Sequence, residues 1–83
     1  MSQIVVYGAD WCPMTKNTLD QLRSLGVPYE YINIENDAEA REWVRRQNGG
    51  LEKKPTVDVC GRILIEPSGA ELEDALAAGR RCG

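Results

Sequence analysis

The chain contains no histidine and no phenylalanine, and only three of its 83 residues are cysteines. The absence of histidine removes the commonest zinc ligand and general base of proteins. An odd number of widely spaced cysteines makes a poor disulfide scaffold and favours a reducing compartment. We therefore expect neither a bound metal ion nor a disulfide-stabilised secreted domain.

The sequence also lacks long apolar runs and a dominant sign of charge. No stretch approaches the roughly 20 apolar residues of a membrane span, and the N-terminus has no basic, signal-like segment. The net charge of -3 comes from mixed signs along the whole chain, which argues against a nucleic-acid or anionic-membrane surface. We expect a cytoplasmic monomer that binds neither partner, with one domain over residues 1–83 because so short a chain leaves nothing for a second core.

What the first half of the sequence does contain is a change from strand to helix patterning and back. Residues 4–7 form a β-branched run typical of a buried strand. Helical spacing follows, with Pro13 where a first helical residue should stand and Gly26 as a C-terminal cap. Residues 29–34 predict a second strand, with isoleucines on one face and tyrosines on the other.

The middle of the chain predicts a second helix and the start of a hairpin. Asn36 and Glu39 resemble a capping box, and the helix after them ends at residues 48–50. After a charged loop, Pro55 opens a third strand, and the pair at residues 60–61 turns the chain back.

The last segment completes the predicted architecture. Residues 62–65 form the returning strand of the hairpin, and Ser68 with Glu71 gives a second capping box before the final helix. The order βαβ, α, ββ, α places the first two strands in parallel through a right-handed crossover. We predict an α/β protein with a thioredoxin fold, in which three helices flank a four-stranded mixed sheet.

Cys12 is the residue most suited to chemistry. It follows the first strand and directly precedes a helix, so its sulfur should face unpaired backbone N–H groups that favour a thiolate. Such positions lower the pKa of a cysteine from about 8.5 to between about 3.5 and 7.5. Lys16, one turn into the helix, adds to this effect if its side chain turns toward the sulfur. The alternative is a buried, inert cysteine.

Pro55 has two interpretations. Alone, a proline that starts a strand is an edge residue or a loop stop. Together with Cys12, it predicts a cis proline that faces the redox cysteine and leaves nearby backbone groups open to a thiol peptide.

These motifs resemble the glutaredoxin family, and within it the actinobacterial mycoredoxin-like branch. The resemblance covers nearly the whole chain through four stretches: VVYGADWCPMT, INIENDAEAREWV, NGGLEKKPTV and PSGAELEDAL. It implies a thiol-disulfide oxidoreductase of redox homeostasis and electron transport, which reduces mixed disulfides between proteins and a low-molecular-weight thiol. It further implies that Cys12 is the nucleophile and Pro55 the cis proline.

The resemblance also implies a groove for the thiol cosubstrate. Its lining would come from residues beside the two motifs, namely Pro13, Met14, Thr15 and Lys54. Ser68 and Gly69, at the start of the last helix, would hold the far end of the cosubstrate. Trp11 is either a lid on this site or a packing group.

Three departures from the family pattern bear on mechanism. Thr15 replaces the second cysteine of dithiol members, which predicts a monothiol mechanism without a bound metal or prosthetic group. Residues 53–54 are lysines instead of Thr-Val, and residues 65–66 are Ile-Glu instead of Gly-Gly. The cosubstrate therefore stays open among glutathione, mycothiol and bacillithiol.

Two other functions are compatible with the sequence. The missing second cysteine is compatible with a non-catalytic adaptor that keeps the fold, and some monothiol relatives carry an iron-sulfur cluster between two subunits. The remaining cysteines have ordinary interpretations. Cys60 is expected to be a turn residue and Cys82 an incidental thiol of the tail, with a resolving role as the alternative for each.

Overall fold

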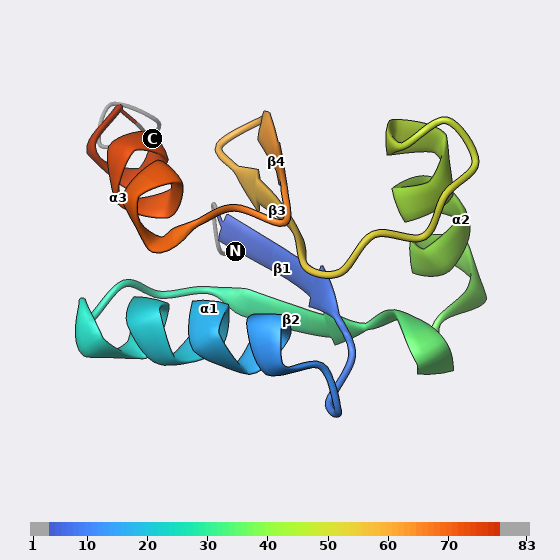
Figure 1. Cartoon of the computed structure of the whole chain (residues 1–83), viewed down its shortest axis with the longest axis horizontal. Coiled ribbons are helices and arrows are strands. Elements are labelled where there is room, and N and C mark those ends of the chain that lie inside the picture. Colours follow the sequence, from blue (N-terminus) through green and yellow to red (C-terminus); the bar gives the residue numbers. More distant parts are fainter. Residues whose placement is uncertain (1–3, 79–83) are drawn as a thin grey trace.

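A computed structural model describes residues 4–78 of the chain; Cys82 and the rest of the predicted tail lie outside them. The elements follow the predicted order (Figure 1). They are β1 (Ile4–Gly8), α1 (Pro13–Ser24), β2 (Glu30–Asn33), the short 3-10 helix η1 (Ile34–Asn36), α2 (Ala38–Gln47), β3 (Thr56–Val59), β4 (Arg62–Ile65) and α3 (Gly69–Ala78).

The four strands form one mixed sheet in the order β2-β1-β3-β4. β1 pairs in parallel with β2, whereas β1 with β3 and β3 with β4 pair antiparallel. Cys60 and Gly61 form the hairpin turn, and both have positive φ angles, of 53° and 92°. The predicted crossover, hairpin and turn are therefore confirmed, and with them the thioredoxin-type plan.

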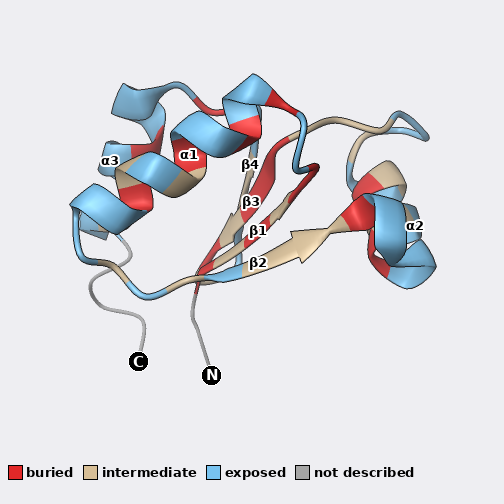
Figure 2. Ribbon diagram, turned by 90° about the horizontal axis from the view of Figure 1, so that it is seen from below, coloured by how far each residue is buried: buried red, intermediate tan, exposed pale blue. Residues whose placement is uncertain are grey.

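Helices cover both faces of the sheet, with α1 and α3 together on one side and α2 apart from them (Figure 2). The core under α1 and α3 is built from alternate residues of the central strands and from the inner faces of both helices: Ile4, Val6, Leu22, Val57, Val59, Leu72 and Ala75. The smaller core under α2 consists of Ile34, Ala40 and Val44, with Tyr7, Ile32 and Trp43 packed against it. The strand alternation predicted from the sequence thus corresponds to two separate apolar layers.

Two of the predicted helix ends are confirmed. After α1, Gly26 adopts a φ of 69°, and the N–H of Val27 donates to the carbonyl of Leu22 at 3.2 Å, as in a glycine C-cap. Before α3, the Ser68 N–H donates to Glu71 Oε1 at 3.0 Å and the Glu71 N–H donates to Ser68 Oγ at 3.1 Å. This reciprocal pair is the predicted capping box.

The cap predicted for the second helix is wrong by one residue. Asp37 is the N-cap, and its Oδ1 accepts the Ala40 N–H at 3.0 Å. Asn36 is not available because it belongs to η1, which Asn33 begins by accepting the Glu35 N–H at 3.0 Å. The predicted strand is correspondingly shorter, since the chain turns into η1 at Ile34.

Within residues 4–78, no helix has both the length and the apolar character needed to cross a bilayer.

Candidate active site

Cys12 is the N-cap residue of α1, with Pro13 directly after it at the first helical position. Its backbone is extended, with φ -79° and ψ 118°, and its N–H donates to the Ala9 carbonyl at 3.1 Å. The residue is 8% exposed. The first turn of α1 therefore directs its unpaired amides at the sulfur, as the position in the sequence predicts.

Thr15 supplies a hydroxyl beside this sulfur. The Thr15 side chain is fully buried, hydrogen bonds to Cys12 and accepts the Ala9 N–H at 3.5 Å. A hydroxyl thus stands at the position where dithiol relatives have a second thiol. It can hydrogen bond a thiolate but cannot form a disulfide with it.

The balance of forces on Cys12 favours the thiolate. Burial raises the pKa of the thiol, but hydrogen bonds from the Thr15 hydroxyl and from the backbone N–H groups of Thr15 and Met14 lower it. The positive charge of Lys54 lowers it further, and the resulting pKa lies below the ordinary cysteine value. The helix-start argument is thereby supported, but the cation that acts on the sulfur is Lys54 rather than the expected Lys16.

The segment from Lys53 to Thr56 faces Cys12 from the other side. The Lys54–Pro55 peptide bond is cis, as the resemblance implies, and the Lys54 carbonyl oxygen lies 3.9 Å from Cys12 Sγ. The Thr56 hydroxyl donates to the Lys53 carbonyl at 2.9 Å, and the Glu66 N–H donates to the Pro55 carbonyl at 2.8 Å. These bonds tie the segment into the sheet and fix its distance from the sulfur.

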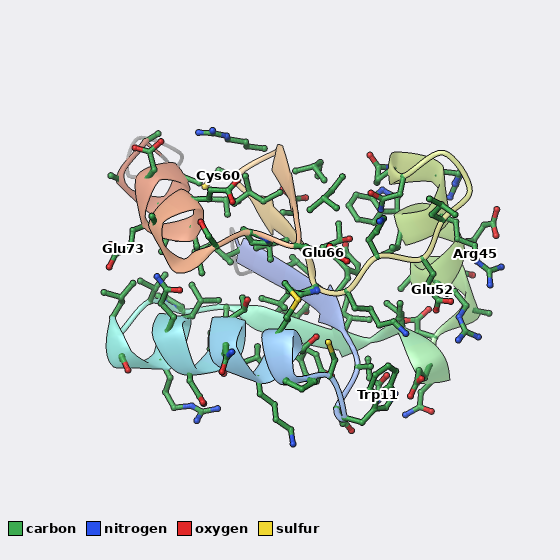
Figure 3. All side chains as sticks on the ribbon, viewed as in Figure 1. Trp11, Arg45, Glu52, Cys60, Glu66 and Glu73 are labelled. Atoms are coloured by element: carbon green, nitrogen blue, oxygen red, sulfur yellow. The ribbon has the colours of Figure 1, made fainter. Side chains whose placement is uncertain are left out.

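Trp11 is not a packing group. It is 61% exposed and lies beside η1 (Figure 3). Its Nε1–H donates to Glu35 Oε2 at 2.8 Å, and the Lys54 ammonium lies 4.7 Å from the centre of its ring. The indole thus connects η1 to the lysine beside the cis proline, which the sequence did not predict.

The residue before Trp11 is also held to the sheet. The Tyr31 hydroxyl donates to Asp10 Oδ1 at 2.7 Å. Burial raises the pKa of Tyr31, and the nearby negative charges of Asp10, Glu35 and Cys12 raise it further, so the phenol stays protonated. Sequence patterning missed Asp10, Tyr31 and Glu35, because a strand tyrosine and loop carboxylates carry no periodic signal for such contacts.

An ion-pair cluster anchors the charged loop to α2. Arg41 Nε lies 2.7 Å from Glu52 Oε1, and Arg45 lies 3.8 Å from the second oxygen of the same carboxylate (Figure 3). The hydrogen bond from Arg41 holds the pKa of Glu52 below its usual value. Arg45, in the last turn of α2, is the outer cation of this cluster.

The remaining predicted site residues divide into two groups. Pro13 and Met14 are exposed next to Cys12, where a substrate can reach them. Ser68 directly precedes α3 and Gly69 is its first residue. Ser68 hydrogen bonds with Glu71 and accepts the Leu72 N–H, and Gln21 Nε2 donates to the Gly69 carbonyl at 2.9 Å. The Ser68 amide that the resemblance assigns to the cosubstrate therefore already binds a carboxylate. Over the described part of the chain, no three His, Cys, Asp or Glu side chains are grouped as metal ligands.

Comparison with known proteins agrees with this geometry. The family model for glutaredoxin matches residues 4–64. Mycoredoxin 1 of Corynebacterium glutamicum is 40% identical over 73 residues, which is 87% of this chain and 90% of the relative.

Solved structures show the same arrangement of elements. A glutaredoxin from Archaeoglobus fulgidus superposes with a TM-score of 0.80 at 26% identity, over 92% of this chain and 87% of the other. A glutaredoxin from Methanosarcina mazei Go1 gives 0.76 at 26% identity, over 90% and 78%. The chain belongs to the glutaredoxin family of thiol-disulfide oxidoreductases.

Proposed function

We propose that this protein reduces mixed disulfides between proteins and a low-molecular-weight thiol by a monothiol mechanism. One observation carries the proposal: the Cys12 sulfur lies among donors that stabilise a thiolate, and the nearest of them in the motif is a hydroxyl, that of Thr15, rather than a second thiol. The arrangement favours attack by Cys12. The motif has no second thiol that could then attack a disulfide formed at Cys12 and free its sulfur.

The reaction then needs two exchanges. In the first, the Cys12 thiolate attacks the small-thiol sulfur of the mixed disulfide, forms a new S–S bond to it and expels the protein thiolate. In the second, the thiolate of another small-thiol molecule attacks that small-thiol sulfur. This restores the Cys12 thiolate and releases the small thiol as its own disulfide. Overall, one free small-thiol molecule is consumed for each protein thiol released, and it leaves joined to the small-thiol unit of the mixed disulfide, so no other reductant is required.

Nearby residues have distinct roles in these steps. Thr15 and the first amides of α1 stabilise the Cys12 thiolate both as nucleophile and as leaving group. Pro13 and Met14 provide an exposed surface next to the sulfur for the substrate. Lys54 and Pro55 form the opposite wall, where the Lys54 charge attracts carboxylates or an incoming thiolate.

Mycothiol is our first choice of cosubstrate, ahead of bacillithiol and glutathione. Ser68 and Gly69 are proposed to contact its far end, where the Glu71 carboxylate already accepts the Ser68 amide. Glu66, two residues before Ser68 in the chain, has a φ of 48° and brings a second carboxylate to this segment of the sequence. Such surroundings suit the hydroxyl groups of a sugar better than the γ-glutamyl carboxylate of glutathione. The similarity to mycoredoxin 1 points the same way. We further propose that the chain acts as a single-domain monomer in the cytoplasm, with disulfide-containing proteins as partners.

Turnover assays with the three thiols test this function. A peptide carrying each thiol as a mixed disulfide is supplied with the same thiol as reductant. Activity is expected with mycothiol, and Cys12→Ser should abolish it, whereas Cys60→Ser and Cys82→Ser should retain most of it. Loss of activity in Cys82→Ser equal to that in Cys12→Ser would replace the monothiol scheme with a resolving tail. Wild-type protein inactive with all three thiols would favour the adaptor function.

A further inference from the structure

Trp11 is held at two points by residues far from it in sequence. Glu35 accepts its Nε1–H at 2.8 Å, and the Lys54 ammonium lies over its ring at 4.7 Å. Trp11 directly precedes Cys12, and the backbone of Lys54 reaches to within 3.9 Å of the Cys12 sulfur. The three side chains therefore form a chain of contacts, Glu35 to Trp11 to Lys54, that ends beside the nucleophile.

We propose that Glu35 is a positioning residue for thiol exchange at Cys12: by fixing the edge of the Trp11 indole, it keeps the Lys54 ammonium next to the sulfur. The indole is mostly exposed, so packing does not orient it. A lysine has a flexible four-carbon stem, and a cation–π contact at an exposed site is weak. How often the Lys54 ammonium lies over the indole therefore depends on the ring being held in the right orientation.

The charge of Glu35 by itself would have the opposite effect. A carboxylate near Cys12 disfavours the thiolate, whereas the Lys54 ammonium favours it. Lys54 from the cis-proline segment acts directly on the charge of Cys12. Tyr31 of β2 is coupled to Cys12 and also to Asp10 of the first loop and Glu35 of η1. Lys16 on α1 contacts Cys12 through its backbone N–H, which donates to the Cys12 carbonyl at 3.1 Å. Removing the Glu35 carboxylate should raise the pKa of Cys12 if Glu35 acts by positioning, and should lower that pKa if Glu35 acts by direct repulsion. The sign of the pKa change therefore distinguishes the two effects.

The experiment is the pH profile of Cys12 alkylation by iodoacetamide in the full chain, followed by peptide mass analysis. Glu35→Ala should raise the midpoint of this pH profile by about 0.3–0.5 pH units. At pH values below the midpoint, the alkylation rate should then be about two- to threefold lower than in the wild type. Glu35→Gln keeps an oxygen acceptor for the indole and should restore most of the wild-type profile. Glu42→Ala, at an exposed carboxylate of α2, is the matched control.

A lower midpoint in both Glu35 variants would mean direct repulsion and would overturn the proposal, as would an unchanged midpoint in Glu35→Ala. Lys54→Gln supplies the second step of a double-mutant cycle. In that background Glu35→Ala should no longer raise the midpoint, and an undiminished effect would rule out action through Lys54. The thermal midpoint of each variant identifies any that are unfolded. For an unfolded Glu35→Ala, Trp11→Phe removes the same hydrogen bond from the other side and should reproduce its shift.

The inference rests on the proposed function only in taking Cys12 as the nucleophile. Alkylation needs no cosubstrate. If the protein were inactive with all three thiols, the proposed function would be overturned, but the effect of Glu35 on Cys12 alkylation could still be measured.

Discussion

The side chain of Thr15 lies directly against the backbone of Gly8, so that a Cβ atom at position 8 would fall 2.5 Å from Thr15 Oγ1 and 2.6 Å from Thr15 Cγ2. Gly8 is the last residue of β1, and Thr15 lies in the first turn of α1. The absence of a side chain at position 8 thus leaves room at the end of β1 for the Thr15 hydroxyl, which hydrogen bonds to Cys12.

Gly8→Ala is therefore expected to disturb the site without adding a polar group. The methyl group must displace a buried threonine, and overpacking of this kind costs about 1–3 kcal/mol. We expect a lower thermal midpoint and a higher pKa of Cys12, measured by differential scanning fluorimetry and by alkylation against pH. Gly69→Ala is the control, since the new Cβ there would lie an ordinary 3.4 Å from Gln21 Oε1. Equal behaviour of the two variants would contradict the role of Gly8.

Thr15→Val tests the hydroxyl itself, since valine has nearly the same shape. The sulfur loses one donor and the Ala9 N–H loses its acceptor, which for a buried group costs about 1–3 kcal/mol. The pKa of Cys12 should rise, so that alkylation at pH 7 slows. Thr18→Val, at a second buried threonine of α1, should leave that pKa unchanged. A pKa unaffected by Thr15→Val would show that the backbone amides suffice.

Glu52→Gln should lower the free energy of unfolding by an amount that depends on pH. The pKa of Glu52 is lowered in the folded state, chiefly by its hydrogen bond with Arg41. The stabilisation is therefore present above the unfolded value of about 4.3 and is lost as the pH falls through the lower folded value.

Because the cluster is partly exposed and screened, we expect a loss of about 0.5–1 kcal/mol at pH 7 that vanishes in acid. Urea unfolding at pH 7 and pH 3 measures it, with Glu73→Gln on the exposed face of α3 as the control. A difference between wild type and Glu52→Gln that persists at pH 3 would show that the ion pair is not its source.

Thr15→Cys should convert the site to a dithiol site. Residues 12 and 15 are the N-cap and third residue of one helix, and their side chains already hydrogen bond. Under mild oxidation the variant should lose two hydrogens and resist alkylation at both positions, as measured by mass spectrometry. Thr18→Cys, one turn further along α1, is the matched control and should not form a disulfide with Cys12. A Thr15→Cys chain that oxidises only between molecules would show that the two sulfurs do not approach.

Much of the fold could be predicted from the sequence because its signals are local. The alternation of tyrosines and isoleucines over residues 29–34, the glycine after α1 and the Ser68–Glu71 box each act within a few residues, and each is present as predicted. The cap of α2 was misplaced because two adjacent residues, Asn36 and Asp37, are both good caps. Only the turn that begins at Asn33 decides between them.

The surroundings of Cys12 were less predictable for a different reason. Its helix-start amides follow from sequence position, but Lys54 is 42 residues away and Glu35 is 24 residues from Trp11. Lysines and carboxylates of exposed loops carry no periodicity, so nothing local distinguishes Lys54 from Lys16. Only the antiparallel pairing of β1 with β3 brings the segment before β3 to the end of β1.

The cis-proline segment reaches Cys12 only in the assembled sheet. The reactivity of Cys12 therefore depends on residues outside its own sequence motif. A peptide containing WCPMT would have the thiol but neither the lysine nor the held indole, and should react like any unstructured cysteine. The rate of alkylation at Cys12 therefore doubles as a probe of folding: molecules in which β3 detaches from β1 should lose nucleophilicity before they lose secondary structure.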